Sequence, residues 1–262
     1  MMLTKRVRRF LVSGVILACG IGCAAVAEAA GVAISPVVLE IDSPRKAIAF
    51  TVSNNGDHPI TLQTEAKVWQ QINGADHNEP TDDLLVVPPI VTVPAGASQI
   101  FRVMLRTPSP SPLERSYRLI LEDISEAQVP SDNEQPSVAF KLTHSLPVMI
   151  APSGKVVNVV RWKPCADDAA SAATAAKPPA ARVGEACVRL LNAGNRRIKV
   201  ATLTLAGDGW QQALSLKNGE NVLAGAEREW RVPLQPGQTG AVRSVQVQTA
   251  LGETLHAEAG GF

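Results

Sequence analysis

The sequence of Leu84–Val103 reads LLVVPPIVTVPAGASQIFRV, and this stretch decides the fold class. Two short runs of apolar and β-branched residues flank the double proline Pro88-Pro89, and a turn signal at Pro94–Gly96 precedes a third run. In the third run Phe101 and Val103 lie on one face of a strand, because side chains alternate across a β-strand. Alternation without helical periodicity predicts the antiparallel strands of a β-sandwich.

The same period-two pattern continues on both sides of this stretch, from Val32 to Ile150. The polar segment Asn73–Asp83 interrupts it and is expected to be a loop. About seven short strands with turns every 8 to 12 residues are typical of an immunoglobulin-like sandwich. A second alternating series follows the proline and glycine of Ala151–Gly154. We therefore predict an all-β protein with two immunoglobulin-like β-sandwich domains, residues 31–152 and residues 153–262.

Residues 1–30 carry the pattern of a secretory signal peptide. Lysine and arginine between positions 5 and 9 precede an apolar run, and Ala27-Glu28-Ala29 offers the small residues that signal peptidase accepts. The apolar run contains glycines and falls short of the about 20 uninterrupted residues of a membrane-spanning helix. No later segment is long and apolar enough to cross a bilayer. We expect export, removal of residues 1–30, and no membrane insertion of the mature chain.

Composition narrows the kinds of partner. The net charge of +1 argues against nucleic acid, since nucleic-acid binding requires a concentrated basic face. The sequence contains no nucleophile elbow, no His-Glu-x-x-His and no phosphate-binding glycine loop. The adjacent acids Asp82-Asp83 and Asp167-Asp168 fall in expected loops, where such pairs are usually just solvated. We predict a binding protein without catalytic activity.

Cysteine usage agrees with an oxidising compartment. Removal of the signal peptide leaves Cys165 and Cys187 as the only pair, and an even pair in an exported protein is more often a disulfide than a metal site. Closing that loop would stabilise the fold by about 3 kcal/mol in the chain-entropy model. The four histidines lack the close spacing of a zinc site, so we expect no metal and no cofactor.

Residues 31–152 resemble the N-terminal domain of the periplasmic chaperones of the chaperone–usher pilus pathway. The resemblance rests on Leu84–Val103 together with Tyr117–Ile124, whereas residues 155–262 match only as a second sandwich. It implies a non-enzymatic periplasmic chaperone that binds pilin-like subunits and delivers them to an outer-membrane usher. In the departures described below, the chain is more similar to the divergent group of chaperones that serves spore-coat-protein-U-like pilins than to the chaperones of the better-known adhesive pili.

The last strand of the first domain is the part that the resemblance implicates in function. In pilus chaperones this strand is lent to an incomplete subunit, whose sheet it completes by strand addition. By that resemblance the donor residues are Val138, Phe140 and Leu142, which lie on one face of the strand. The alternative is that they face the core of their own domain. Because an apolar sheet edge invites a cover, a self-capping dimer is a further hypothesis for the unloaded protein.

The family also anchors the C-terminal carboxylate of the subunit, with an arginine in the first strand and a lysine at the end of the last. This chain departs from that pattern at both places, with valine where the arginine is expected. If the two final strands are antiparallel neighbours, Arg115 and Arg118 can present guanidinium groups to a carboxylate in the interdomain cleft. Lys141 is a third candidate. For all three the alternative is a solvated surface charge.

Three further interpretations remain open at this level. Tyr117 opens the penultimate strand of the first domain, either as a tyrosine corner or as an ordinary core residue. The chain is alternatively a pilus subunit or adhesin, although a pilin is expected to have a single incomplete sandwich. It is also alternatively a carbohydrate-binding sandwich module, against which the aromatic content of 4% and the dispersed tryptophans argue.

Overall fold

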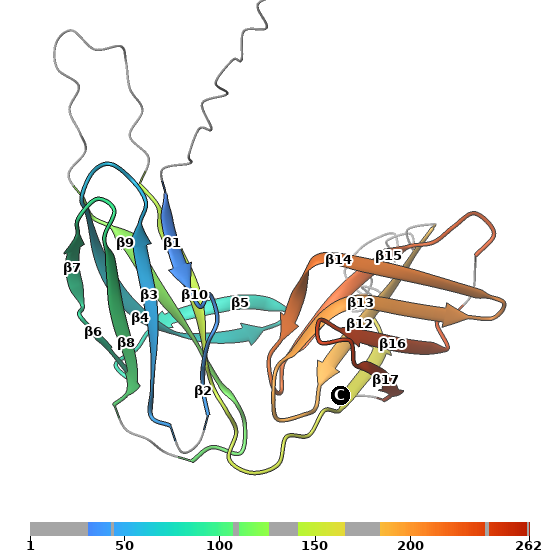
Figure 1. Ribbon diagram of the computed structural model, residues 1–262. Helices are drawn as coiled ribbons and strands as arrows, with labels where there is room; N and C mark the ends of the chain where they lie inside the picture. The colour runs from blue at the N-terminus through green and yellow to red at the C-terminus, as the bar shows by residue number, and fades with distance from the viewer. Residues whose placement is uncertain are drawn as a thin grey trace, which may run out of the picture.

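The computed structural model describes residues 31–42, 45–106, 110–125, 141–165, 184–238, 241–260 and 262. Within these ranges the regular elements are all strands, and they form two domains that meet at an angle (Figure 1). The predicted all-β class with two immunoglobulin-like sandwiches is confirmed. The signal peptide lies outside the described residues, and the exact domain limits stay a prediction. The part of the chain that the structure describes includes no helix capable of spanning a membrane.

The first domain consists of two facing sheets. One sheet has the order β1-β3-β8-β6, and its strands are β1 (Val32–Ser35), β3 (Ala47–Asn54), β8 (Ser98–Leu105) and β6 (Leu84–Val87). The other has the order β2-β10-β9-β4-β5, with β7 also paired to β4; its strands are β2 (Leu39–Ile41), β10 (Thr143–Ile150), β9 (Arg115–Asp123), β4 (Ile60–Ile72), β5 (Ala75–Pro80) and β7 (Ile90–Val93). The double proline therefore lies where the chain crosses from one sheet to the other.

Alternating side chains of both sheets form the core of this domain. Phe50 of β3 and Phe101 of β8 stack with ring centroids 5.0 Å apart. Leu119 and Leu121 of β9 are fully buried against them, together with Val148 of β10. Because every second residue of these strands is apolar, the period-two pattern of the sequence is the pattern of the core.

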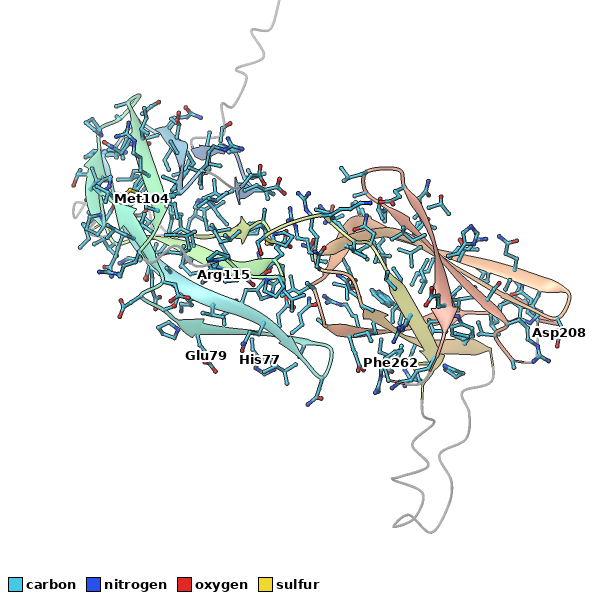
Figure 2. The ribbon with its side chains drawn as sticks, turned by 90° about the horizontal axis from the view of Figure 1, so that it is seen from below. His77, Glu79, Met104, Arg115, Asp208 and Phe262 are labelled. Carbon is cyan, nitrogen blue, oxygen red and sulfur yellow. A yellow bond between two sulfur atoms is a disulfide. The ribbon has the colours of Figure 1, made fainter. Side chains whose placement is uncertain are left out.

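The expected loop at Asn73–Asp83 was wrong. Its first part is strand β5, which pairs antiparallel with the end of β4 after a tight turn at Asn73 and Gly74. Both turn residues have positive φ, 52° and 79°, which Asn-Gly tolerates and which suits a two-residue hairpin. All six residues of β5 are exposed, so no alternation of polarity marks the strand in the sequence. The hairpin, with His77 and Glu79 on β5, extends toward the second domain (Figure 2).

The seven strands of the second domain pair in the order β14-β13-β16-β17-β11-β12-β15. The short parallel pairing of β17 with β11 joins the two sheets of this sandwich, β14-β13-β16-β17 and β11-β12-β15. The strands are β11 (Val160–Pro164), β12 (Glu185–Asn192), β13 (Ile198–Gly207), β14 (Trp210–Val222), β15 (Glu227–Pro233), β16 (Ser244–Thr249) and β17 (Thr254–Ala259). Three tryptophans lie buried in one cluster of this domain, Trp162, Trp210 and Trp230. Their dispersion in the sequence thus reflects core positions on different strands.

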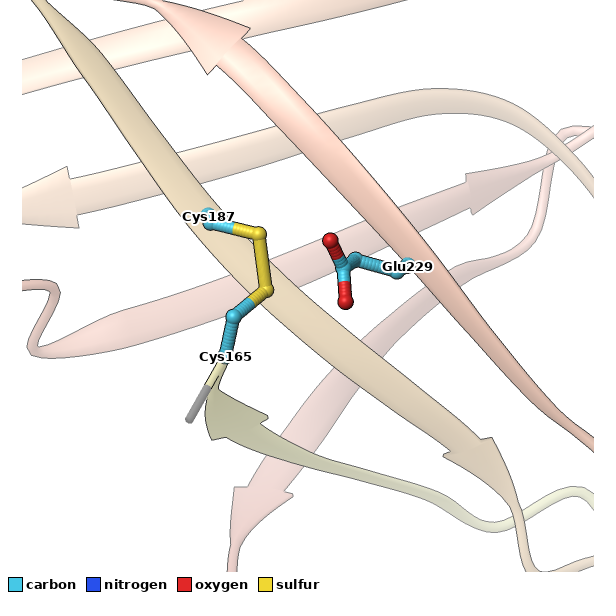
Figure 3. A group of neighbouring side chains, drawn as sticks. All are labelled: Cys165, Cys187 and Glu229. Carbon is cyan, nitrogen blue, oxygen red and sulfur yellow. A yellow bond between two sulfur atoms is a disulfide. The ribbon is translucent and has the colours of Figure 1, made fainter. Parts of the chain in front are cut away.

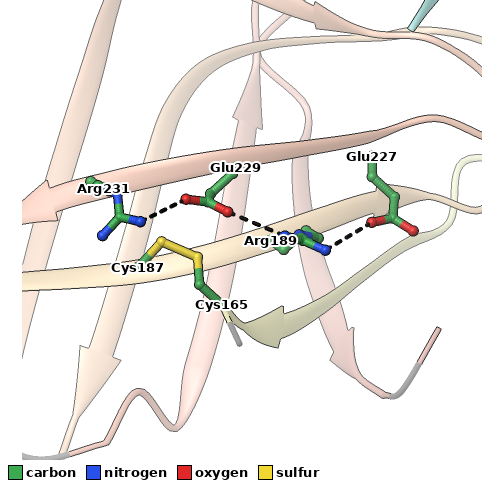
Figure 4. The surroundings of a disulfide bond; sticks show 6 residues. All are labelled: Cys165, Cys187, Arg189, Glu227, Glu229 and Arg231. Carbon is green, nitrogen blue, oxygen red and sulfur yellow. Dashed lines mark hydrogen bonds and ion pairs between the residues drawn. A yellow bond between two sulfur atoms is a disulfide. The ribbon is translucent and has the colours of Figure 1, made fainter. Parts of the chain in front are cut away.

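The predicted disulfide between Cys165 and Cys187 is present. It joins the end of β11 to β12 across the sheet, with a Cα–Cα distance of 5.4 Å. The carboxylate of Glu229 lies beside the two sulfur atoms (Figure 3), and the three potential ligand atoms are within 4.8 Å of one another. The sulfurs are bonded to each other, and Glu229 forms ion pairs with Arg189 and Arg231 (Figure 4). This cluster is therefore a cross-strand staple beside an ion-pair network and offers no thiolate to a metal.

Candidate subunit-binding edge and interdomain cleft

The predicted donor strand is only partly within the described residues. Val138 and Phe140 lie outside them, and Leu142 directly precedes β10. The Leu142 side chain is 51% exposed. Its carbonyl accepts a hydrogen bond from the backbone N–H of Asp123, which continues the pairing of β10 with β9 by one residue. Leu142 thus sits at the start of the ladder with its side chain accessible.

One side of β10 is an open edge over half its length. The strand pairs with β9 along all of Thr143–Ile150, but on its other side β2 covers only Val148–Ile150. Within the described ranges no strand pairs with the second side of Thr143–Pro147. The unpaired backbone groups of such an edge are a ready template for another strand.

The core-facing side chains of β10 become more exposed toward the N-terminal start of the strand. Val148 and Leu146 face the first core and are 0% and 5% exposed, His144 is intermediate, and Leu142 is half exposed. These residues share one face, since they are two apart in the strand. The sandwich therefore closes over this face at Leu146 and leaves it accessible at Leu142. This is the place where an added strand would cover apolar surface.

At the other end of the ladder Arg115 faces a cleft between the domains. Arg115 pairs with Ile150 in the antiparallel register, as the sequence argument expected for neighbouring strands. The cleft has a volume of about 460 Å³ and is lined by β4, by the start of β9 and by residues 223–226 of the second domain. Figure 2 shows Arg115 on the side of the first domain that is nearer to the second.

Tyr117 belongs to the core and also reaches the cleft. Its ring is 2% exposed among the core side chains of the first domain, so ordinary core packing is what the structure shows. The hydroxyl donates a hydrogen bond to the Asp83 carboxylate at 2.9 Å, whereas a tyrosine corner would bind the backbone. Burial first, and then the bond to Asp83, raise the pKa of Tyr117 to about 12, although the charge of Arg115 acts in the opposite direction.

Arg118 points away from Arg115. The two residues are three apart in a strand and so lie on opposite faces of β9. The Arg118 guanidinium carbon lies 3.7 Å from the ring centroid of Trp69, a cation–π contact. Burial lowers the pKa of Arg118, partly offset by the charge of Asp76. Arg118 is therefore engaged with an aromatic ring between the domains and does not share the face of Arg115.

Lys141 lies at the far end of the β9–β10 ladder from the cleft. It precedes Leu142 and is exposed. It is nine steps along the chain from Ile150, which correspond to roughly 30 Å of extended strand. The structure therefore does not bring Lys141 together with Arg115, and a single carboxylate cannot contact both.

No pattern in the sequence predicts the ion-pair network that joins the domains. Glu114, with a side chain 2% exposed, accepts hydrogen bonds from the Arg197 backbone N–H at 3.0 Å and from its guanidinium at 2.7 Å. Arg197 also pairs with Glu40, and Arg196 contacts both acids. Burial raises the pKa of Glu114 despite the two arginines. Burial acts the same way on Glu40, but the bonds and charges of Arg197 and Arg196 prevail and lower its pKa.

The β4–β5 hairpin forms a second connection. Trp69 is 3% exposed and packs in the apolar cluster of the second domain. The Gln71 side-chain amide donates to the Asn221 carbonyl and accepts from the Leu223 N–H, both at 2.9 Å. The Asn-Gly turn was the one sequence signal that could have identified this hairpin. Its contacts with residues about 150 positions later could not be read from the sequence.

Comparisons with known proteins agree with this architecture. Residues 31–155 match the family model of the pili and flagellar-assembly chaperones, PapD N-terminal domain. No curated protein matches the chain in sequence. Among solved structures, a chain of the CsuC–CsuE chaperone–tip adhesion subunit pre-assembly complex of Acinetobacter baumannii Csu pili superposes with a TM-score of 0.63 at 19% identity, covering 88% of this chain and 100% of that one.

Two other solved structures show the same fold. The Salmonella enterica SafA pilin–SafB chaperone complex contains a chain with a TM-score of 0.56 at 16% identity, covering 87% of this chain and 96% of that chain. For the E. coli chaperone DraB the TM-score is 0.55 at 17% identity, with 88% and 97% covered. Residues 31–155 of the chain therefore carry the N-terminal domain of the pilus-assembly chaperone family, and the whole chain has the fold of these chaperones.

Proposed function

We propose that the protein is a non-enzymatic periplasmic chaperone that binds a pilin-like subunit by strand addition and delivers it to an outer-membrane usher. The observation that carries the proposal is the open edge of β10 at Thr143–Pro147, next to the exposed Leu142. An incomplete subunit that adds a strand here gains backbone hydrogen bonds and covers apolar side chains. The solved complexes with a tip adhesion subunit and with a pilin support this kind of partner.

The donor residues in this proposal are Val138, Phe140 and Leu142. Burying three such side chains in a subunit groove contributes about 1.5 to 3 kcal/mol for each. That is enough to hold an unfinished fold and still allows exchange for a better-fitting strand. We place the client among the spore-coat-protein-U-like pilins, because the departures of this sequence resemble the chaperones of that group.

The cleft provides the second contact of the proposal. Arg115 lines the cleft beside the end of β10 that β2 covers, beyond the open part of the edge, and its guanidinium suits bidentate recognition of a carboxylate. Arg118 contributes positive potential from the opposite face, held against Trp69. Lys141 is too far away to share this carboxylate and is assigned to the donor end of the client.

Co-purification from the periplasm tests the proposal. The chain is co-expressed with a candidate spore-coat-protein-U-like pilin, as the wild type and as the Phe140→Asp/Leu142→Asp double variant. The expected result is a folded double variant that no longer retains the pilin. Leu251→Asp is the matched control, since Leu251 is 96% exposed in the second domain and should leave binding unchanged. A double variant that misfolds indicates that these residues face their own core, and one that keeps the pilin overturns the donor assignment.

Two further parts of the proposal have their own measurements. Delivery predicts that the chaperone–pilin complex, and not the pilin alone, binds the purified usher. An open β10 edge also allows a self-capping dimer of the unloaded protein. In that case Leu142→Asp shifts the unloaded chain from dimer to monomer on size-exclusion chromatography with light scattering.

A further inference from the structure

Three side chains from two separate parts of the chain converge in the interdomain cleft. Asp83 directly precedes β6, whereas Arg115 and Tyr117 both lie on β9, and all three line the cleft. Arg115 and Tyr117 are two residues apart in a strand, so their side chains project from the same face. The hydroxyl of Tyr117 donates to Asp83 at 2.9 Å. An acid, a phenol and a guanidinium therefore line the same cleft.

Two of these groups are held firmly. The Tyr117 ring is buried in the core of the first domain, and its strand pairs with Val68 on one side and with Val148 on the other. The backbone of Asp83 donates to the Thr81 hydroxyl and accepts from the Arg106 N–H, at 3.2 and 2.8 Å. The phenol oxygen is thus fixed in position and in orientation by a bond to a fixed acid. The Arg115 side chain is the third group, and it projects from the same face of β9 as the phenol.

The direction of the phenol hydrogen bond leaves an acceptor for the arginine. Because the hydroxyl hydrogen is directed to Asp83, the oxygen lone pairs remain for a donor. The charge of the Arg115 guanidinium and its hydrogen bond to this oxygen both lower the pKa of Tyr117. Burial and the hydrogen bond to Asp83 outweigh this effect of Arg115 and raise the pKa of Tyr117 to about 12. At neutral pH the hydroxyl is therefore always protonated and keeps this orientation.

We propose that Tyr117, oriented by Asp83, is the positioning residue that holds the Arg115 guanidinium ready for the C-terminal carboxylate of a client strand. The inference rests on the proposed function, because it assigns a role in recognising that carboxylate. An arginine that is already held in place loses less rotamer freedom on binding than a mobile one. Tyr117 and Asp83 thus make the anchor selective for a strand that ends in a free carboxylate, without touching the client themselves.

Paired peptides test this selectivity in the full chain. The probes are a fluorescent ten-residue peptide of alternating valine and threonine with a free C-terminal carboxylate, and the same peptide with an amidated C-terminus. By fluorescence anisotropy the wild type is expected to prefer the free carboxylate about tenfold, the effect of one charge-assisted hydrogen-bonded pair. Arg115→Ala is expected to abolish the preference. Equal binding of both peptides by the wild type would overturn the carboxylate anchor, and this inference with it.

Three variants isolate the positioning role. Tyr117→Phe and Asp83→Ala are expected to reduce the preference to about twofold while the amidated peptide binds as before. Asp83→Asn keeps an oxygen that accepts the hydroxyl, and it is expected to retain the tenfold preference. A merely structural role would weaken both peptides together. If Arg115→Ala loses the preference and Tyr117→Phe keeps it, the anchor stands and the positioning role is wrong.

A second measurement needs no client. In ¹⁵N-arginine-labelled protein, the Arg115 Nε–H signal is identified by its absence in Arg115→Ala. It is expected to be shifted away from the exposed-arginine region in the wild type and to return toward it in Tyr117→Phe. An unchanged signal in Tyr117→Phe contradicts the inference.

Discussion

Arg115 lies directly opposite Ile150 in the β9–β10 ladder, and Glu122 lies opposite Thr143 at the other end. The cleft and the open edge are therefore two ends of one pair of strands. The eight steps from Ile150 back to Leu142 span roughly 27 Å in extended conformation. A client strand whose carboxylate is bound at Arg115 has its contact with Leu142 fixed at this distance from its end.

This distance predicts a parity effect in the client. Removal of one C-terminal residue from a bound pilin shifts its strand by one position and turns its apolar face away from Leu142, since the side-chain period is two. Removal of two residues restores the face. We expect the one-residue truncation to weaken binding more than the two-residue truncation, measured by competition against the full-length pilin. A steady decline with each residue removed would contradict anchoring at the cleft.

A single charge at the donor end should reduce client affinity. Leu142→Asp removes an apolar contact of about 1.5 to 3 kcal/mol and places a charge in the subunit groove. We expect at least a tenfold weaker Kd by surface plasmon resonance, with an unchanged thermal unfolding midpoint because Leu142 is half exposed. Leu142→Met is the conservative control and should bind like the wild type. A large loss of stability in Leu142→Asp would instead assign the residue to the chain's own core.

The disulfide should stabilise the second domain. The bridge closes a loop with a sequence separation of 22, which corresponds to about 3 kcal/mol in the chain-entropy model. Cys165→Ser/Cys187→Ser is expected to lower the free energy of unfolding of this domain by about that amount in urea. Wild-type protein unfolded with reductant serves as the control and should behave like the double variant. Equal midpoints for oxidised and serine forms would show that the staple contributes no stability.

The two acids of the interdomain network should respond to pH in opposite ways. The folded pKa of Glu114 is above its ordinary value of 4.5, so the folded state retains this proton more strongly than the unfolded chain. The stability of the wild type relative to Glu114→Gln is therefore expected to fall as the pH rises from 4.5 through the raised pKa.

Glu40 has the opposite shift. Its folded pKa is below 4.5, so its contribution is present above pH 4.5 and is lost as the pH falls through the lowered pKa. The stability of the wild type relative to Glu40→Gln should decrease on acidification. Urea unfolding at half-unit pH steps between 3 and 7 gives both slopes, and Glu79→Gln, whose acid is exposed on β5, is the control. Slopes of the same sign for the two glutamate variants would contradict the assignment.

Trp69 should couple the two domains. Its side chain is buried in the cluster of the second domain although it belongs to a strand of the first. Trp69→Ala is expected to cost about 3 to 5 kcal/mol and to split a single unfolding transition into two in calorimetry. Gln71→Ala, which removes two hydrogen bonds from the same hairpin to the second domain, should cost only about 1 to 2 kcal/mol. A single sharp transition in Trp69→Ala would show that the ion pairs and the Gln71 hydrogen bonds suffice to join the domains.

The alternation of apolar and polar residues was sufficient to predict most strands. It failed for a strand whose residues do not alternate between buried and exposed. The strands around Phe50 and Phe101 have one buried and one exposed face, and their sequences show it directly. Strand β5 is exposed on both faces, so no alternation of polarity in its sequence predicts a strand. The separation of Arg115 from Arg118 was also within reach of the sequence, because residues three apart in a strand lie on opposite faces.

By itself the sequence determined the all-β class, the two sandwiches, the disulfide and the strand that resembles a donor, because each depends on short-range alternation or on a count of cysteines. Only the tertiary structure decided what lies between the domains. Glu114 and Arg197 are 83 positions apart, and Gln71 and Leu223 are 152 apart, so no periodicity relates them. Such contacts exist only where the two domains meet, and the cleft that Arg115 and Tyr117 line depends on that meeting.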